Sequence, residues 1–257
     1  MCTFALYFQT FGHYPLVVAA NRDEHFDRPS SAPALLDGHP KILAGLDLRA
    51  GGTWLGVNEF GLFAGVLNRH GNGSNDTALP ASAARSRGLL CMELLRAQSV
   101  PRALNIIKHD DARYNPFTLV FGDQDAAYAA YNDTANIIVQ PLKPGLHVFS
   151  SAAEFDLNSA KAARAHQRFA QLIHSPGPHN EPPTEWLPSL QHILGDHSLA
   201  DGSEDPGDAI CVHRQASGTV SSSVIFLAQS KRCFSTFHCT GAPCQNDFGP
   251  ALNLRLQ

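Results

Sequence analysis

The order of the predicted elements indicates an α+β protein, in which antiparallel sheets carry helices on their faces. Strands and helices come in blocks along the 257 residues: strands, helices, strands, helices and strands again. This order has neither the strict alternation of strand and helix that builds a parallel sheet nor the unbroken strands of an all-β chain. Short turns between successive strands favour antiparallel pairing, and helices then cover the sheet faces. We therefore expect one domain over residues 1–257, with roughly the last 20 residues as a loose tail.

Apolar runs bounded by turn residues define the strands. The first two runs, 2–8 and 16–21, flank a turn at 11–15, and a second hairpin joins 52–57 to 62–67. The later predicted strands span 117–121, 126–131, 137–139, 147–150, 209–213, 220–228 and 232–239.

Apolar residues at helical spacing define the helices. The predicted helices span 82–98, 102–109, 161–173 and 184–194. Between the second hairpin and the first helix, residues 69–81 are rich in Gly, Asn and Ser. This composition predicts a loop that is long enough to act as a lid.

Composition and charge exclude several classes of protein. With 44% hydrophobic and 16% charged residues, the chain is globular rather than disordered. A net charge of −4 argues against nucleic acid or an anionic membrane surface as the main partner. No apolar run is long enough to span a bilayer, and the apolar N-terminus lacks the basic region of a signal peptide, so we expect a cytoplasmic protein. The six scattered cysteines favour thiols over a disulfide framework.

Cys2 is the first candidate for chemistry. Removal of the initiator methionine would leave a free α-amine beside the Cys2 thiol. An α-amine with an ordinary pKa of about 8 is partly neutral near pH 7, and it can take the thiol proton without another side chain. Cys2 would then be an N-terminal nucleophile. The alternative is a small buried residue that begins a strand.

Four polar residues, Asn21-Arg22-Asp23-Glu24, come at the end of the second strand. The hairpin returns them to the start of the first strand, next to Cys2. In that position Asp23 would hold or orient the α-amine, and Asn21 would donate a hydrogen bond to an oxyanion. The alternative is a turn with an ordinary surface pair between Arg and Asp.

The C-terminal cysteines are a second candidate set. Cys239 and Cys244 are separated by four residues and lie near Cys233 and His238, and such a set suits a soft metal or haem iron. The alternative is a strand end with incidental thiols. None of the 13 histidines falls in a common zinc or haem-attachment motif, so no metal site is assigned.

Two N-terminal blocks carry a resemblance to a known family. Met1-Cys2-Thr3 and Ala19-Ala20-Asn21-Arg22-Asp23-Glu24, followed by Arg28-Pro29, resemble the NRDE-motif family, also called the transport and Golgi organization protein 2 family. Later blocks that resemble the family are 45–47, 51–56, 64–68, 86–90 and 114–119.

This resemblance implies an N-terminal-nucleophile hydrolase fold, a four-layer αββα sandwich of two mainly antiparallel sheets. The N-terminus is also similar to that of bile salt hydrolases and penicillin V acylases. By this likeness Cys2 is the nucleophile, Asp23 holds the α-amine and Asn68 is the oxyanion-hole asparagine. Those hydrolases carry an arginine where this chain has Ala20, and Arg22 is the candidate to replace it.

Two further positions depart from the relatives. Ser151 stands where the hydrolases use an asparagine, and Val220 stands where family members have an arginine. An oxyanion partner and a buried cation are therefore expected to be missing. These departures weaken the case for acyl-transfer catalysis without changing the expected fold.

Two functions follow from these residues and the resemblance. The first is hydrolysis of a C–N amide bond in a small molecule through a thioester on Cys2, with no cofactor required. The second, implied by the family, is a non-enzymatic carrier that binds and traffics haem, acyl-CoA or lipid in the same cleft. The ligand contacts are expected from Trp54, Phe60, Phe63, Arg28 and Arg69.

Overall fold

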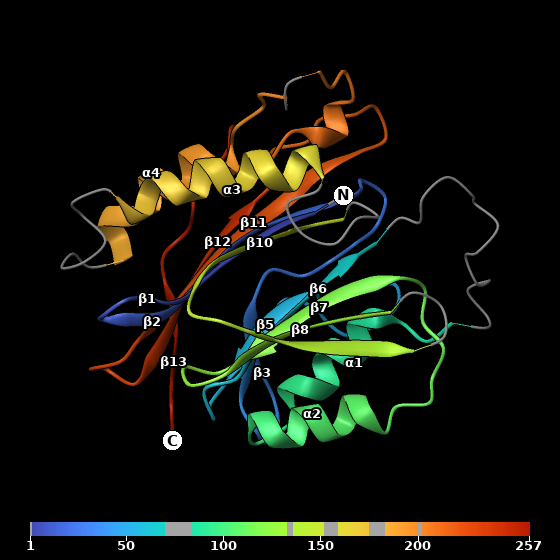
Figure 1. Ribbon diagram of the computed structural model, residues 1–257, viewed down its shortest axis with the longest axis vertical. Coiled ribbons are helices and arrows are strands. Elements are labelled where there is room, and N and C mark those ends of the chain that lie inside the picture. The colour runs from blue at the N-terminus through green and yellow to red at the C-terminus, as the bar shows by residue number, and fades with distance from the viewer. Residues whose placement is uncertain (1, 70–83, 133–135, 152–158, 175–182, 200–201) are drawn as a thin grey trace. The chain divides into compact units, whose positions relative to one another are not determined.

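The computed structural model describes residues 2–69, 84–132, 136–151, 159–174, 183–199 and 202–257 (Figure 1). The sequence predicts a single domain, and the chain forms two compact units. The first unit comprises Met1–Asp27 and Pro144–Asn253, and the second comprises Arg28–Lys143 and Leu254–Gln257. Each unit contains one sheet and one hydrophobic core.

A six-stranded sheet in the order β10-β1-β2-β11-β12-β13 lies in the first unit, except that Leu254 and Arg255 of β13 belong to the second. The strands are β1 (Thr3–Phe11), β2 (Tyr14–His25), β10 (Gly145–Ser150), β11 (Ser217–Ala228), β12 (Cys233–Thr240) and β13 (Leu252–Arg255). β1 and β2 form the predicted hairpin, and β11 returns from the C-terminal part of the chain to pair antiparallel with β2. This pairing places residues from both ends of the sequence next to each other.

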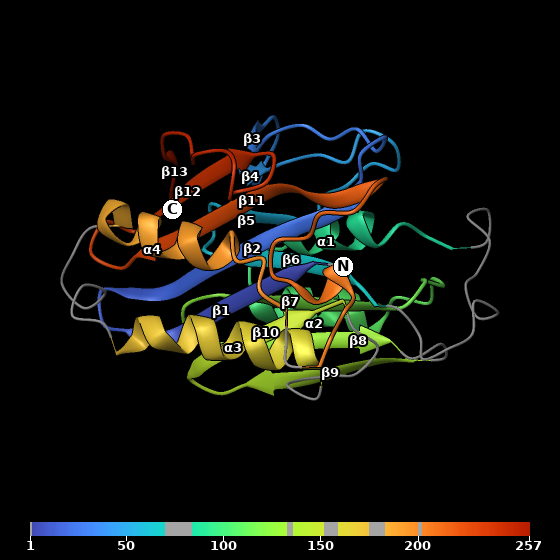
Figure 2. The ribbon, with the colours of Figure 1, turned by 90° about the horizontal axis from the view of Figure 1, so that it is seen from above.

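Two helices cover one face of this sheet, α3 (Ala160–Ile173) and α4 (Pro183–Leu194) (Figure 1). α3 packs on β10 and β1, and α4 packs on β2 and β11, as the second view shows (Figure 2). Ser159 caps α3, because its hydroxyl accepts the backbone N–H of Ala162. The enclosed core includes Phe11, Phe169 and Trp186.

The second unit contains a seven-stranded antiparallel sheet in which the strands follow their order in the chain. Its strands are β3 (Ala34–Leu36), β4 (Ile42–Ala44), β5 (Leu55–Asn58), β6 (Phe63–Asn68), β7 (Phe117–Gly122), β8 (Ala127–Asn132) and β9 (Ile137–Leu142). α1 (Arg87–Leu95) packs on β5, β6 and β7, and α2 (Val100–Lys108) packs on α1. Two mainly antiparallel sheets with helices on a face confirm the predicted α+β class.

The polar cluster at residues 21–24 lies inside β2, whereas the sequence predicts that the strand ends at Asn21. The register pairs Asn21 with Ser222 and Asp23 with Thr219, so β2 continues to His25. Charged residues are uncommon in buried strands, which explains the early predicted end. Here β11 satisfies the backbone of the cluster, and only 7% of Asp23 is exposed.

Other predicted elements also differ from the structure. Residues 209–213 form no strand and contribute only an isolated bridge between His213 and Gly218. The C-terminal residues expected as a loose tail contain the strand β13, and Leu254 in it is buried. The predicted loop at 69–81 lies, apart from Arg69, outside the described residues. Among the described residues, no helix is both long enough and apolar enough to cross a bilayer.

Candidate functional site

Cys2 lies beside the polar cluster of β2, as the hairpin predicts. The register of β1 and β2 pairs Thr3 with Asn21, which places Cys2 next to that cluster. The Cys2 thiol donates to the backbone carbonyl oxygen of Asp23 at 3.7 Å. The Cys2 backbone nitrogen donates to the Ser151 hydroxyl oxygen at 2.7 Å, and the Ser151 N–H donates back to the Cys2 carbonyl at 3.3 Å. Sulfur and nitrogen of Cys2 are thus both held by polar partners.

The Asp23 carboxylate is buried between a cation and a hydroxyl. One of its oxygens accepts a hydrogen bond from Thr219 Oγ1 at 2.6 Å, and the other lies 3.3 Å from Lys161 Nζ. The Lys161 and Asp23 side chains are only 1% and 2% exposed. Lys161 Nζ also donates to the Gly207 carbonyl oxygen at 3.1 Å. A buried ion pair of this kind persists because further hydrogen bonds satisfy both charges.

Lys161 is the buried cation that the sequence predicts to be missing. Ala20 and Val220 carry no charge, and the ammonium group beside Asp23 comes from the first turn of α3. A signal for Lys161 exists in the sequence, because its spacing to the buried Ala165 and Phe169 places it on the apolar stripe of the helix. A lysine on such a stripe needs a buried partner.

Asn21 holds the surrounding backbone together. Its Nδ2 donates to the carbonyl oxygens of Leu194 at 2.8 Å and Ile210 at 2.9 Å, and its Oδ1 accepts from the Ser222 hydroxyl. Both amide hydrogens are therefore used within the protein, and the oxyanion role expected for Asn21 does not fit this arrangement. The Asn21 side chain is a positioning group that connects β2 to the last residue of α4 and to Ile210.

Arg22 lies on the opposite face of β2 from Asn21 and Asp23, because side chains alternate along a strand. Arg22 is 5% exposed, and its guanidinium lies 3.9 Å from the Glu24 carboxylate on the same face. The cation that pairs with the Asp23 carboxylate is therefore Lys161 and not Arg22.

Burial raises the pKa of the Cys2 thiol above its ordinary value, and the Asp23 carboxylate raises it further, whereas the Lys161 ammonium lowers it. A thiol with a raised pKa is protonated near neutral pH, so it needs a base before it can act as a nucleophile.

Alkylation of Cys2 by iodoacetamide should therefore be slow at pH 7 in the chain that retains Met1. The rate should rise with pH and reach its half-maximum above the ordinary thiol pKa of about 8.5, since only the thiolate reacts. Peptide mapping after timed alkylation measures the rate at Cys2, with N-acetylcysteine as the unburied reference. A half-maximum at or below that of the reference would contradict the effect of burial.

Asn68 and Arg69 belong to the second unit. Asn68 is the last residue of β6 and pairs with Phe117. Arg69 Nη1 donates to the Asn132 carbonyl oxygen at 3.4 Å, and its guanidinium carbon lies 5.4 Å from the centre of the Tyr131 ring. The convergence of Asn68 with Cys2 stays a prediction.

The aromatic residues predicted to frame a ligand cleft lie apart along the β5–β6 hairpin. Phe60 is in the turn, where its ring lies 5.8 Å from that of His39, and Phe63 begins β6 and is 1% exposed. Trp54 lies nearer the other end, where its carbonyl accepts the Val66 N–H at 2.8 Å. Three residues of a strand separate Phe63 from Val66 by about 10 Å, and a ligand wall shared by the three aromatic side chains stays a prediction.

The second unit also contains Arg28, a predicted ligand contact, and two cavities that could hold a ligand. Arg28 donates through Nε and Nη2 to one Asp47 oxygen, at 2.9 and 2.7 Å, so its charge already has a carboxylate partner. Two cavities of about 950 and 530 Å³ border α2, one lined also by Tyr114 and Asn132 and the other also by His39. Neither of these two cavities is lined by Trp54, Phe60 or Phe63.

The fold is similar to that of a solved acylase and a solved acid amidase. A penicillin V acylase from Agrobacterium tumefaciens matches with a TM-score of 0.58 at 12% identity, over 91% of this chain and 82% of the acylase. A Caenorhabditis elegans ortholog of N-acylethanolamine-hydrolyzing acid amidase matches with a TM-score of 0.56 at 11% identity, over 87% of this chain and 92% of the amidase. At these identities the likeness concerns the fold, and it confirms the N-terminal-nucleophile hydrolase-like architecture expected from the sequence.

Sequence comparison assigns the family. The bovine Transport and Golgi organization protein 2 homolog is 34% identical over 119 residues, which are 44% of this chain and 40% of the bovine protein. The mouse homolog is 43% identical over 58 residues, which are 21% of each chain. The aligned part thus spans about two fifths or less of these relatives. The model of the family Transport and Golgi organisation 2 matches residues 1–237, nearly the whole sequence. The chain belongs to the Transport and Golgi organisation 2 family.

Proposed function

We propose that the chain is a cysteine amidohydrolase that cleaves the C–N bond of a small N-acyl amide, with Cys2 as the nucleophile after removal of Met1. The observation that carries this proposal is the arrangement around Cys2. Its thiol lies 3.7 Å from the Asp23 backbone carbonyl oxygen, its nitrogen lies 2.7 Å from the Ser151 hydroxyl oxygen, and the Asp23 carboxylate is bound by Lys161. The names of the structurally similar acylase and amidase suggest the substrate class.

The α-amine supplies the base. The Cys2 nitrogen is an amide N–H while Met1 is attached, and removal of Met1 converts it into an amine at the same place, beside Ser151 Oγ. The neutral amine takes the Cys2 proton, which overcomes the raised pKa of the buried thiol. The Asp23 carboxylate stabilises the resulting ammonium, while Lys161 offsets the cost of burying the Asp23 charge.

The reaction then proceeds in two halves. Cys2 Sγ forms a bond to the amide carbonyl carbon, the C–N bond breaks, and the α-ammonium gives its proton to the leaving amine. A thioester remains on Cys2. Water, deprotonated by the α-amine, attacks the thioester carbon, the C–S bond breaks, and the carboxylic acid leaves as the thiol regains a proton. Asn68 is the predicted donor to the oxyanion in both halves.

Trapping the thioester tests this proposal directly. The natively purified chain, with removal of Met1 verified by intact mass, is mixed with a panel of N-acyl amides and quenched in acid within seconds. An added acyl mass on the Cys2 peptide, lost on treatment with hydroxylamine, is the expected result. Protein that retains Met1 is the matched control and should carry no acyl group, because its Cys2 nitrogen cannot accept a proton.

Carriage of haem or an acyl ligand is the second candidate, and no contact among the described residues favours carriage over hydrolysis. Arg28 is paired with Asp47, and the aromatic wall of such a ligand site stays a prediction. A chain with Met1 removed that forms no thioester with any amide of the panel, yet binds haem or acyl-CoA tightly, would replace the hydrolase proposal with the carrier.

A further inference from the structure

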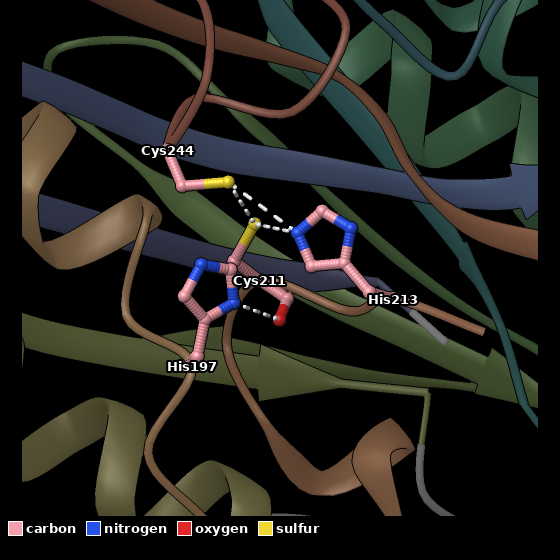
Figure 3. Close-up of side chains that lie close together, drawn as sticks. All are labelled: His197, Cys211, His213 and Cys244. Atoms are coloured by element: carbon pink, nitrogen blue, oxygen red, sulfur yellow. Dashed lines mark hydrogen bonds between the residues drawn. The ribbon is translucent and has the colours of Figure 1, made fainter.

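Four thiol and imidazole side chains meet in the first unit (Figure 3). They are His197, Cys211, His213 and Cys244, and one ligand atom from each lies within 4.8 Å of all the others. Cys211 is buried, and the two histidines and Cys244 are exposed. The cluster combines two thiols and two imidazoles, the donor set of many structural zinc sites.

The distances between the donor atoms match those around a tetrahedral zinc ion. Cys211 Sγ lies 3.7 Å from Cys244 Sγ and 3.6 Å from His213 Nε2, and His213 Nε2 lies 3.3 Å from Cys244 Sγ. With Zn–S and Zn–N bonds of about 2.3 and 2.0 Å, the edges of a tetrahedron are about 3.8 Å between two sulfurs and about 3.5 Å between sulfur and nitrogen. These three atoms therefore already lie at the spacing of one face of a coordination tetrahedron.

The His197 ring makes a hydrogen bond that is typical of metal-binding histidines. Its Nδ1 lies 3.3 Å from the Cys211 carbonyl oxygen, a contact in which Nδ1 carries the proton and donates it (Figure 3). Metal-binding histidines usually donate one ring N–H to a backbone carbonyl in this way, which leaves the lone pair of the other nitrogen for the metal. The His197 and His213 rings lie 4.8 Å apart between their centres. Nε2 of His197 is thus the nitrogen left to act as a fourth ligand atom.

Hydrogen bonds within the protein connect the segments that carry the four side chains, without any ion. The Cys211 N–H donates to the Asp196 carbonyl oxygen at 2.9 Å, which joins the segment of Cys211 to that of His197. Gln191 Nε2 donates to the Pro243 carbonyl oxygen at 3.1 Å, which ties the loop of Cys244 to α4. Ligands preorganised on separate segments lose little further freedom when an ion binds.

We propose that His197, Cys211, His213 and Cys244 form a structural zinc site that joins the end of α4, the segment before β11 and the loop after β12. Four protein ligands close the coordination sphere, so the ion would stabilise the fold rather than bind substrate. The zinc proposal rests on the contacts of these four residues and not on the proposed hydrolase. It differs from the set that the sequence suggests, because Cys239 is buried and its thiol donates to the Asn246 carbonyl oxygen at 3.3 Å.

Zinc content and affinity test the site. The full chain is purified without chelators or affinity metals, its zinc is measured by elemental mass spectrometry, and zinc affinity is measured by competition with a chromogenic chelator. About one zinc per chain is expected for a site with four ligands. Cys244→Ser and His213→Ala, both at exposed positions, should each weaken binding by on the order of 100-fold, at least as much as loss of an outer-shell partner does.

Cys233→Ser is the matched control, since this half-buried thiol lies on β12 outside the cluster, and it should leave zinc affinity unchanged. Cobalt in place of zinc should give the visible absorption of a tetrahedral thiolate site in the wild type and lose it in Cys244→Ser. Equal zinc affinity in wild type and both ligand variants would overturn the proposal. So would an intact mass that shows Cys211 and Cys244 joined as a disulfide in freshly purified, metal-free protein.

Discussion

Replacement of Cys2 by alanine should abolish amide hydrolysis by the chain from which Met1 has been removed. The proposed reaction forms its covalent bond to Cys2 Sγ, and among the described residues no other cysteine hydrogen-bonds to this half-buried thiol and could replace it. Loss of a nucleophile typically costs about 10⁴-fold or more in kcat. Steady-state hydrolysis of the best amide from the panel, followed by amine release, measures the effect.

Two comparisons make this result specific to Cys2. Cys233→Ala removes another half-buried thiol and should keep full activity. Binding of the same amide to Cys2→Ala, measured by calorimetry, should remain close to that of the wild type, because the substitution removes only the reacting atom. If Cys2→Ala retains more than a tenth of the wild-type kcat, the nucleophile has been assigned wrongly.

Lys161→Met should destabilise the protein by about 3–5 kcal/mol, because it leaves the buried Asp23 carboxylate without its cation. The methionine side chain fills a similar volume, so the loss reflects charge rather than packing. Urea denaturation followed by circular dichroism measures the free energy of unfolding. The variant should also lose most of the hydrolysis, since Asp23 is proposed to support the α-amine.

A double variant and a surface pair serve as controls. In Asp23→Leu/Lys161→Met both charges are gone, and much of the lost stability should return, because a buried pair can often be replaced by apolar residues at little cost. Arg214→Ala, which breaks an exposed pair with Asp205, should change stability by less than about 1 kcal/mol. A loss below about 1 kcal/mol in Lys161→Met would mean that the Lys161–Asp23 contact does not hold the site together.

The sequence by itself determined the local parts of the molecule. The hairpin of β1 and β2 follows from two apolar runs around a short turn, and it brings Cys2 to the cluster that contains Asp23. α3 and α4 follow from apolar residues at helical spacing. The N-terminal motifs predicted the family to which the chain belongs, and the match of the family model over residues 1–237 confirms this prediction. In each case the signal lies within a few residues, where spacing alone decides which side chains share a face.

Only the tertiary structure decided which distant residues complete the sites. Lys161 and Thr219 reach Asp23 across 138 and 196 positions of sequence, and Cys211 meets Cys244 across 33. Local periodicity carries no information on such pairs, because they depend on how α3 and β11 pack against β2. The same packing provides acceptors for both side-chain amide hydrogens of Asn21. It also pairs β2 with β11 as far as His25, so the strand continues past the charged residues. A polar residue in a strand is stabilised by partners from elsewhere in the chain, and packing of the whole unit supplies them.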